Sequence, residues 1–361
     1  MRIGKLFSPL TLLRRRDKIR EKIRDKKAEG FLVLHQPNIF YLTGFTGEGF
    51  FLLLREKSFL FTDYRYLPSS PPAADDWEFV PVKKDYYRSL REKIQEEKAK
   101  KIAVEAIHVS VARWKELNKC KNVKWLLLPG CVEEARTIKD KEEIEFIKEA
   151  LNISKKVLKE VPGILRAGMQ ERELAVEIEY HLRKYGSEPL PFVPIVASGK
   201  NASLPHATPG TNKIEPGEPL IVDLGAKVNG YCADLTGTFF PGREESKWRE
   251  RKILVEEAIR ISLASIKPGV KCKDIFLKVR DFFKRHRVEK NFLHALGHGV
   301  GIEVHELPTL SFRGKEEIKE NMVFTLEPGL YFPGEGGVRE EIMVLVQGGD
   351  YGRSYGQCKH S

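Results

Sequence analysis

A short turn constrains the fold of this chain more than any other feature of its sequence. Asn229-Gly230 separates two alternating apolar runs, LIVDLGAKV and YCADLTGTFF. An Asn-Gly pair between such runs is the strongest short-range signal for a two-residue β-hairpin, because both residues adopt the positive φ angles that the turn needs. The turn pairs Val228 with Tyr231 and so sets the register of the two strands. The sequence therefore predicts a hairpin, and its apolar flanks indicate that the hairpin is buried.

Two aspartates lie on one face of the predicted hairpin. Counting back from the turn places Asp223 opposite Thr236, and Asp234 is two residues from Thr236. The two carboxylates are then diagonal neighbours, about 7–8 Å apart at Cα, and they repel each other unless a cation lies between them. One interpretation is a pair of surface aspartates near a turn. The apolar neighbours Ile221 and Val222 favour a buried pair instead, where a bare charge is costly.

Three of the nine histidines fall within one segment of twelve residues. The segment FLHALGHGVGIEVHE contains His294, His298 and His305, and glycines flank His298 on both sides. Glycine allows the backbone to approach its neighbours closely, as a buried ligand position often requires. A single histidine here would most often be structural, so the clustering is what suggests a site.

Glutamates that enter strand-like runs complete the set of candidates. Glu327 precedes a proline in TLEPG, and Glu340 and Glu341 begin an apolar run, where strand alternation lets only one of the two face inward. One histidine and four carboxylates form a nitrogen and oxygen ligand set without sulfur. Four carboxylates balance the charge of two divalent ions, and oxygen-rich ligation favours Mn²⁺, with Co²⁺ and Zn²⁺ tolerated. Two such ions can activate a water for hydrolysis.

The length of 361 residues indicates two domains. Residues 31–131 alternate six strand-like apolar runs with helical segments at 85–101 and 109–120, and Pro129-Gly130 ends this region. A long charged helix follows over 132–160, and further helices are expected at 170–186, 246–267 and 272–286, among strand-rich and glycine-rich segments. We therefore predict an α/β domain over 1–131 and an α+β domain over 132–361.

The net charge of +11 belongs mainly to one segment. Residues 1–30 hold eleven Lys or Arg against four Asp or Glu, most of them in RRRDKIREKIRDKKAEG. A sparse apolar stripe of Leu13, Ile19, Ile23 and Ala28 predicts an amphipathic surface helix with a solvated basic face. Binding to nucleic acid or to a membrane surface is the alternative, but no aromatic interleaving or groove-binding motif accompanies the charge.

Composition also indicates a compartment. No apolar run approaches the ~20 residues of a membrane span, and the stretch LFSPLTLL runs into three arginines without a small-residue cleavage site. The five cysteines, Cys358 among them, have irregular spacing and no C-x-x-C pair, which argues against a disulfide scaffold and a cysteine-based zinc site. We expect a cytoplasmic protein with no membrane or nucleic-acid partner.

The chain resembles the pita-bread metallopeptidases in the order of its candidate ligands: Asp223, Asp234, His298, Glu327 and Glu341. This superfamily includes prolidase (Xaa-Pro dipeptidase), Xaa-Pro aminopeptidase and methionine aminopeptidase. The resemblance is close within NASLPHA, VDLGAKVNGYCADLTGTF, GHGVGIEVHE, TLEPGLY and GGVREE. The segment before residue 132, with YLTGFTGE and TDYRY, resembles the N-terminal domain of prolidases and Xaa-Pro aminopeptidases, which methionine aminopeptidases lack. The resemblance implies an α+β pita-bread catalytic domain after a smaller α/β domain.

The resemblance also implies a role for each candidate ligand. Asp223 would hold one metal ion and His298 the other, while Asp234 and Glu341 would bridge the two. Glu327 would be a ligand that also takes a proton from the attacking water.

Four further residues receive roles from the same resemblance. His206 and His305 would steady the scissile carbonyl or the tetrahedral intermediate and relay protons. His294 would lie near the substrate proline, and Arg339 would support the site from behind the ligands.

Two positions depart from the family pattern. Relatives often read R-I-E-D after the glycines, whereas this chain reads R-E-E-I, so Ile342 replaces an acid. We align Glu341 with the ligand and keep Glu340 as the alternative. Many relatives also carry Arg four residues after the histidine of the H-E pair, where this chain has Thr309.

The resemblance implies a dinuclear, cytoplasmic Xaa-Pro dipeptidase that acts on peptides with proline at the second position and forms a homodimer. An Xaa-Pro aminopeptidase acting on longer peptides is the main alternative, followed by an aminopeptidase of other specificity. A creatinase-like hydrolase shares the fold without needing metal ligands. A catalytically inactive binding module would be expected to lose ligand positions, and all five are present here.

Overall fold

The computed structural model describes residues 6–66, 76–242, 245–348 and 353–354, so Cys358 lies outside the described residues. Contacts divide the chain into two compact units, Met1–Arg136 and Thr137–Ser361. The predicted domain boundary, after residue 131, falls at the start of helix α5 (Cys131–Arg136). No helix of the described ranges is long and apolar enough to cross a membrane.

The N-terminal unit is built on a mixed sheet of six strands. The strands β1, β2 and β3 pair antiparallel, whereas β3/β4, β1/β5 and β5/β6 pair parallel. All six strands expected from the apolar runs are present. The four inner strands are almost wholly buried, as in a sheet covered on both faces, whereas the two edge strands are partly exposed. Their order across the sheet is β4 (Trp77–Val82), β3 (Ser58–Asp63), β2 (Gly49–Leu54), β1 (Gly30–Val33), β5 (Lys101–Glu105) and β6 (Lys124–Leu128).

The N-terminal unit contains the two helices expected between its strands and one helix that the sequence did not predict. The expected helical segments appear as α3 (Tyr86–Glu96) and α4 (Val111–Leu117). The unpredicted helix is α2 (Gln36–Thr43), in which six of eight residues are buried. A helix that is buried almost all round lacks the polar face that produces a 3.6-residue period, so periodicity does not reveal it.

The basic segment forms helix α1 (Pro9–Asp25), but its basic residues are not all solvated. Arg15 and Arg16 are only 2% and 1% exposed. Arg16 donates two hydrogen bonds to Asp76, at 2.8 and 2.6 Å, and one to the Leu42 carbonyl at 2.8 Å. Arg15 donates to the Tyr41 carbonyl at 2.9 Å. The prediction of a merely solvated basic face is therefore wrong at these two positions, which tie the helix to its own unit.

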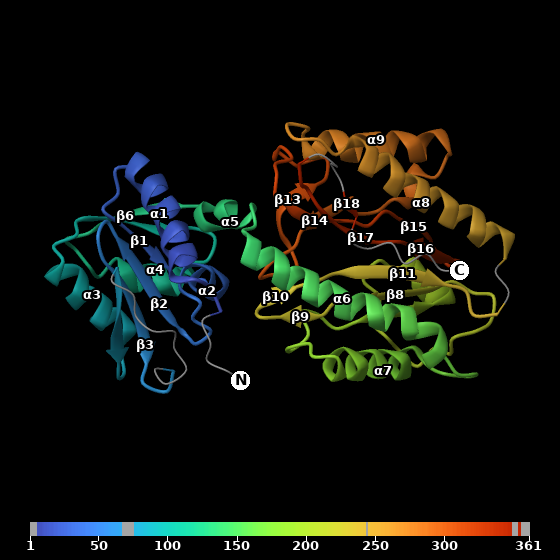
Figure 1. The fold of residues 1–361 in the computed structure, drawn as a ribbon, viewed down its shortest axis with the longest axis horizontal. Coiled ribbons are helices and arrows are strands. Elements are labelled where there is room, and N and C mark those ends of the chain that lie inside the picture. The colour runs from blue at the N-terminus through green and yellow to red at the C-terminus, as the bar shows by residue number, and fades with distance from the viewer. Residues whose placement is uncertain (1–5, 67–75, 243–244, 349–352, 355–361) are drawn as a thin grey trace. The chain divides into compact units, whose positions relative to one another are not determined.

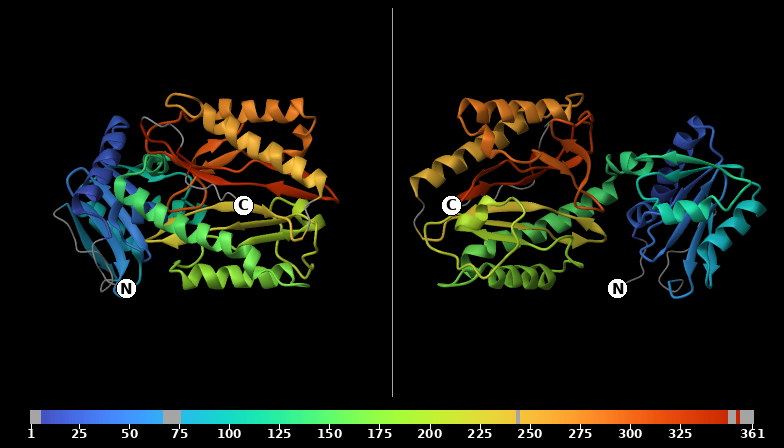
Figure 2. Two further views of the ribbon diagram at one scale, coloured as in Figure 1. Left: turned by 45° about the vertical axis from the view of Figure 1, so that its right-hand side comes forward. Right: turned by 180° about the vertical axis from the view of Figure 1, so that it is seen from behind.

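The C-terminal unit contains two layered halves (Figures 1 and 2). Helices α6 and α7 cover a three-stranded sheet, and helices α8 and α9 cover the other side of the unit over a five-stranded sheet. The first half comprises α6 (Lys141–Ile164), α7 (Glu171–Lys184), β7 (Ile195–Ser198), the 3-10 helix η2 (Gly199–Ser203), β8 (Leu220–Leu224) and β11 (Leu235–Phe239). The second comprises α8 (Ser246–Ser265), α9 (Cys272–Arg285), the 3-10 helix η3 (Glu289–Asn291), β12 (Gly297–Gly299), β13 (Glu306–Leu310), β14 (Val323–Leu326), β17 (Ile342–Leu345) and β18 (Arg353–Ser354).

The long helix predicted over 132–160 is two helices, α5 and α6. Asp140 ends the break between them: its side chain accepts a hydrogen bond from the Glu143 backbone N–H, and the Glu143 carboxylate accepts one from the Asp140 N–H. This capping box satisfies two backbone donors at the start of α6. An aspartate followed three residues later by a glutamate marks this boundary in the sequence, and the prediction of one helix did not use that pattern.

The register predicted for the hairpin is confirmed. Val228 pairs with Tyr231 and Asp223 pairs with Thr236. The hairpin is formed by two short ladders, β9 (Lys227–Val228) with β10 (Tyr231–Cys232), and β8 with β11. Gly225 lies between them, where an added Cβ would come within 2.2 Å of the Ala233 carbonyl oxygen. A second short hairpin, β15 (Gly329–Phe332) with β16 (Gly336–Arg339), lies beyond the glutamate of TLEPG.

Candidate metal centre

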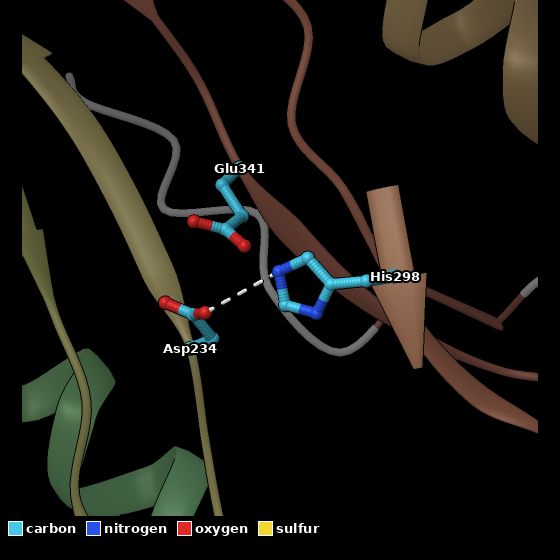
Figure 3. A group of neighbouring side chains, drawn as sticks. All are labelled: Asp234, His298 and Glu341. Atoms are coloured by element: carbon cyan, nitrogen blue, oxygen red, sulfur yellow. Dashed lines mark ion pairs between the residues drawn. The ribbon is translucent and has the colours of Figure 1, made fainter. Parts of the chain in front are cut away.

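Three side chains from distant parts of the chain converge in the C-terminal unit (Figure 3): Asp234, His298 and Glu341. One potential ligand atom from each lies within 4.8 Å of those of the other two. Asp234 directly precedes β11, His298 lies in the middle of β12, and Glu341 lies between β16 and β17. The hairpin of the first half and the sheet of the second half therefore meet at this point.

Glu327 and Asp223 join the same cluster. The Glu327 Oε1 lies 3.2 Å from the His298 Nε2, and the Asp234 Oδ2 lies 3.7 Å from the same nitrogen. Asp223 lies close enough to Glu327 for that carboxylate to raise its pKa, and close enough to Asp234 to raise the pKa of that residue in turn. The structure thus brings together all five residues that the sequence suggested as ligands.

The two adjacent glutamates point in different directions. The Glu340 Oε1 accepts a hydrogen bond from the Thr238 backbone N–H at 3.0 Å and lies 3.1 Å from the Lys252 Nζ. Glu341 faces Asp234 and His298 instead, and its Oε2 accepts a hydrogen bond from the Thr236 hydroxyl at 2.7 Å. Of the two alternatives, only Glu341 therefore faces the other candidate ligands.

Two carboxylate oxygens in the cluster are buried without a hydrogen bond. Within the described ranges, the Asp223 Oδ1 and the Glu341 Oε1 have no donor. Buried carboxylate oxygens almost always have a donor or a cation, since an unpaired one loses its hydration without compensation. One imidazole nitrogen and four carboxylates form the oxygen-rich donor set that suits Mn²⁺. The cluster fits divalent metal ions for both reasons.

The pKa values of the carboxylates in the cluster also favour a bound cation. Burial, followed by repulsion from neighbouring carboxylates, raises the pKa of Asp234 and the pKa of Glu341 well above their usual values. Burial also raises the pKa of Asp223, although Arg339 opposes that change. Burial acts to raise the pKa of Glu327 as well, but the hydrogen bond with His298 and the positive charges around it together lower the pKa to about 2. Without metal, the four carboxylates therefore resist being ionised together.

The ring of His298 is oriented as a ligand would be. Its Nδ1 lies 3.1 Å from the Gly299 carbonyl oxygen, which can only accept, so the hydrogen-bond network assigns the proton to Nδ1. With the proton on Nδ1, Nε2 is the nitrogen that would bind a metal ion, as in histidines whose backbone partner fixes the metal-binding tautomer. In the metal-free protein Nε2 can instead carry a proton and donate it to Glu327. Burial acts to lower the pKa of His298, but the hydrogen bonds to Glu327 and Gly299 and the nearby carboxylate charges together raise it.

Arg339 lies beside the cluster and contacts one of the candidate ligands, Asp223. Its guanidinium donates to the Asp223 Oδ2 at 2.7 Å, to the Thr236 hydroxyl at 3.2 Å and to the Pro205 carbonyl at 3.1 Å. It also donates to the Tyr331 hydroxyl at 2.9 Å. Arg339 is itself buried, and these partners hold its pKa above the usual range despite burial.

Tyr331 links Arg339 to His294, and the sequence analysis assigned it no role. The Tyr331 hydroxyl lies 2.8 Å from the His294 Nε2, and the His294 Nδ1 lies 2.7 Å from the Ala295 carbonyl oxygen. Because that carbonyl needs a donor, Nδ1 carries the proton and Nε2 accepts from the tyrosine. Burial lowers the pKa of His294 and raises that of Tyr331 to about 12, so both are held neutral. Tyr331 was part of the quoted motif TLEPGLY, but no spacing rule connects it to His294.

His305 and His206 are the two exposed members of the set. The His305 ring packs edge-on against the His298 ring, with 4.2 Å between centroids. Burial, followed by the charge of His298, lowers the pKa of His305. His206 lies in the loop after η2, and it is close enough to His294 and His305 to affect the pKa of each. The structure therefore places both histidines near the cluster but at its exposed side.

Comparison with known protein families assigns both units. Residues 145–348 match metallopeptidase family M24, and residues 15–138 match the creatinase/prolidase N-terminal domain. The first match covers the candidate metal centre entirely, and the second covers most of the N-terminal unit.

Known proteins of similar sequence and structure extend over almost the whole chain. The Xaa-Pro dipeptidase of Pyrococcus furiosus is 32% identical over 330 residues, which cover 90% of this chain and 93% of that protein. The structure of the Xaa-Pro dipeptidase from Bacillus anthracis has a TM-score of 0.91 at 29% identity, covering 95% of this chain and 97% of the other. The X-Pro aminopeptidase structure from Thermotoga maritima has a TM-score of 0.87 at 33% identity, with 94% and 99% covered. The predicted fold, a pita-bread domain after a smaller α/β domain, is confirmed.

Proposed function

Because this chain belongs to metallopeptidase family M24, we propose that it hydrolyses the peptide bond between an N-terminal residue and proline, as an Xaa-Pro dipeptidase. The observation that carries this proposal is the buried carboxylate cluster with two oxygens that have no donor among the described residues. Xaa-Pro dipeptidases and an X-Pro aminopeptidase are among the proteins that resemble it along nearly their full length.

The cluster would hold two divalent ions, with Mn²⁺ the first candidate and Co²⁺ and Zn²⁺ as alternatives. The ligands would be the five residues Asp223, Asp234, His298, Glu327 and Glu341, with Asp234 and Glu341 shared between the ions. When bound, such a pair of ions supplies an activated water and polarises the scissile carbonyl.

The surrounding residues would handle substrate and protons. Glu327 would accept a proton from the attacking water, because its carboxylate lies within the cluster, 3.2 Å from the His298 Nε2. His206 and His305 lie at the exposed side, where an N–H from either ring can stabilise the developing oxyanion. His294 already uses both ring nitrogens in hydrogen bonds, so we assign it to packing against the substrate proline and not to proton transfer.

The choice between dipeptidase and aminopeptidase depends on the group that follows proline. A dipeptide places its free carboxylate there, and a buried carboxylate needs a cation or several donors. Arg339 is committed to Asp223, Thr236 and Tyr331. Thr309, where many relatives carry Arg, pairs with His298 across β12 and β13, so this position adjoins the centre without a positive charge. That observation favours the second candidate, an Xaa-Pro aminopeptidase acting on longer peptides.

Comparing three substrates separates these possibilities. We would measure kcat/KM for Ala-Pro, Ala-Pro-Ala and Ala-Ala with Mn²⁺ present. A tenfold preference for Ala-Pro, equal to about 1.4 kcal/mol in the transition state, supports the dipeptidase, and the reverse preference supports the aminopeptidase. Equal turnover of Ala-Ala contradicts proline specificity, and no turnover of any peptide favours an inactive binding module.

The proposal also covers the compartment, the oligomeric state and the partners of the enzyme. We place it in the cytoplasm as a homodimer that binds neither membranes nor nucleic acid. Sedimentation of the metal-loaded protein tests the dimer. A nucleic-acid titration at two salt concentrations tests the last point, because phosphate-driven binding weakens steeply as salt rises.

A further inference from the structure

A buried carboxylate closes the loop that carries His206. Glu171 is the first residue of α7 and is 0% exposed. Its Oε1 accepts a hydrogen bond from the Ser198 backbone N–H at 2.7 Å, and its Oε2 accepts one from the Gly210 backbone N–H at 3.0 Å. The Asn201 Nδ2 donates to both oxygens, at 3.1 and 3.0 Å. Because Ser198 and Gly210 lie on either side of the loop, one carboxylate fastens both of its ends.

Only a carboxylate satisfies all of these donors. Each oxygen of Glu171 accepts a backbone N–H, and a carboxylate offers acceptors at both ends. A glutamine of the same shape would present an NH₂ group to either Ser198 or Gly210, and that backbone N–H would then be buried without an acceptor. Glutamine in this position therefore loosens one end of the loop, which keeps only its backbone hydrogen bonds.

The middle of the loop is fixed against the opposite side of the site. The Pro205 carbonyl accepts a hydrogen bond from the Arg339 Nη1 at 3.1 Å. The Ala202 carbonyl oxygen lies so close to Gly337 that a Cβ there would approach it to 2.2 Å. His206 itself is exposed, so packing around its ring contributes little to its position. Its placement therefore depends on the loop backbone. The Glu171 side chain holds both ends of this backbone, and backbone hydrogen bonds from Gly199 to Pro219 and from Arg172 to Gly210 hold them as well.

We propose that Glu171 is the positioning residue for His206. Glu171 acts through the loop, by holding the His206 ring where its N–H can reach the scissile carbonyl. This inference rests on the proposed function in one respect, namely that His206 takes part in hydrolysis.

The first test compares two variants of helix α7. Glu171→Gln removes one of the two side-chain anchors of the loop, and Glu179→Gln removes an equal charge at an exposed position of the same helix. In Glu171→Gln we expect kcat for the Xaa-Pro substrate to fall roughly tenfold or more, approaching the loss seen when an oxyanion donor is removed. We expect KM to change less than about twofold, because the ligands and the proline-binding residues are untouched. Glu179→Gln should match the wild type in both constants.

A second readout does not depend on activity. Amide hydrogen exchange across residues 198–212 of the metal-free protein should be faster in Glu171→Gln than in wild type, while the helices α8 and α9 keep their protection. Unchanged exchange in this segment would overturn the proposal. Faster exchange throughout the C-terminal unit would also overturn it, because Glu171 would then be a general stabiliser of the fold.

A double-mutant cycle separates positioning from a structural role. His206→Asn removes the group that Glu171 is proposed to position. If Glu171 acts through His206, adding Glu171→Gln to His206→Asn should lower kcat by less than about twofold. A full additional tenfold loss would show that Glu171 acts on some other part of the site.

A milder variant keeps the proposal testable if Glu171→Gln does not fold. Asn201→Ala removes the side-chain donor to both Glu171 oxygens and leaves the two backbone bonds in place. We expect faster exchange in the same segment and a smaller loss of kcat. If wild type fails to cleave Xaa-Pro peptides, the proposed function fails, and the exchange measurements still decide whether Glu171 holds the loop.

Discussion

Buried carboxylates occur in both units of the molecule, and the two groups differ in their partners. Glu105 of the N-terminal unit is 3% exposed. Its Oε2 accepts hydrogen bonds from the Leu34 and His35 backbone N–H groups at 2.6 and 2.8 Å, and its Oε1 accepts one from the Asn38 Nδ2 at 2.6 Å. In the C-terminal unit, the Asp223 Oδ1 and the Glu341 Oε1 have no such donor among the described residues.

The difference shows which property marks a functional site. Burial raises the pKa of Glu105 just as it raises the pKa of Glu341, so a perturbed pKa does not separate the two groups. Glu105 ties a strand end to helix α2, and its donors account for both of its oxygens. Asp223, Asp234, Glu327 and Glu341 instead lie close together, and two of them keep a buried oxygen without a donor among the described residues, which a divalent cation would satisfy. Variants of Glu105 and Asp234 should therefore behave differently.

The largest effect should be on activity. Asp234→Ala removes a proposed bridging ligand, and we expect kcat/KM to fall below about one thousandth of wild type. Excess chelator should abolish activity in wild type, and Mn²⁺ or Co²⁺ should restore it. Circular dichroism should show that Asp234→Ala and the chelator-treated wild type are folded. Glu105→Gln is the control, and it should retain wild-type kcat per folded molecule. Full activity of Asp234→Ala, or of wild type in chelator, would contradict the two-metal interpretation.

The two groups should respond with opposite signs when stability is measured without metal. Glu105→Gln turns an amide NH₂ toward buried backbone donors and should lower the free energy of unfolding by about 1–3 kcal/mol. Asp234→Asn removes one of several repelling charges and should raise the midpoint of urea unfolding in chelator. Destabilisation by both variants would mean that the two clusters are alike.

The pH dependence of stability provides a third contrast. The pKa values of Asp234 and Glu341 are raised in the metal-free fold, so their contribution is present below the pKa values of the unfolded chain and is lost as pH rises. The pKa of Glu327 is lowered to about 2, so its contribution is lost as pH falls below about 4.5. The melting temperature in chelator should therefore fall as pH rises from about 5 to 8. Asp234→Asn should flatten this slope, and an unchanged slope in that variant contradicts the assignment.

The smallest effects are expected in helix α1. Arg16→Gln breaks the pair with Asp76 and the bond to the Leu42 carbonyl, and should cost about 1–2 kcal/mol of stability. Arg14→Gln changes an exposed neighbour and is the matched control, with no measurable change in melting temperature. Neither variant should alter kcat/KM, because both lie in the N-terminal unit. Equal stability of the two variants would restore the interpretation of α1 as a solvated basic helix.

The sequence predicted those parts of the structure that short-range patterns determine, such as turns and apolar runs. The turn at Asn229-Gly230 determined the pairing of Asp223 with Thr236, and apolar runs determined the six strands of the N-terminal sheet. Helix α2 has no polar face, and the burial of Arg15 and Arg16 depends on carbonyls and an aspartate far along the chain.

Within the site, too, the sequence did not predict features that depend on contacts between distant residues. The five candidate ligands could be ordered by a family resemblance, but alternation alone left Glu340 and Glu341 equivalent until their partners were known. Tyr331 and Glu171 acquire their roles only through tertiary hydrogen bonds to His294 and to the His206 loop. No sequence spacing encodes those contacts.

Counting bound metal tests the central claim most directly. Protein stripped with chelator, dialysed, and titrated with Mn²⁺ in a calorimeter should bind two ions per chain, and activity should rise with occupancy. Asp234→Asn should bind fewer than two, whereas Glu105→Gln should bind as wild type does. Binding of no ion by wild type, or full binding by Asp234→Asn, would contradict the assignment of the buried carboxylate cluster as a two-metal centre.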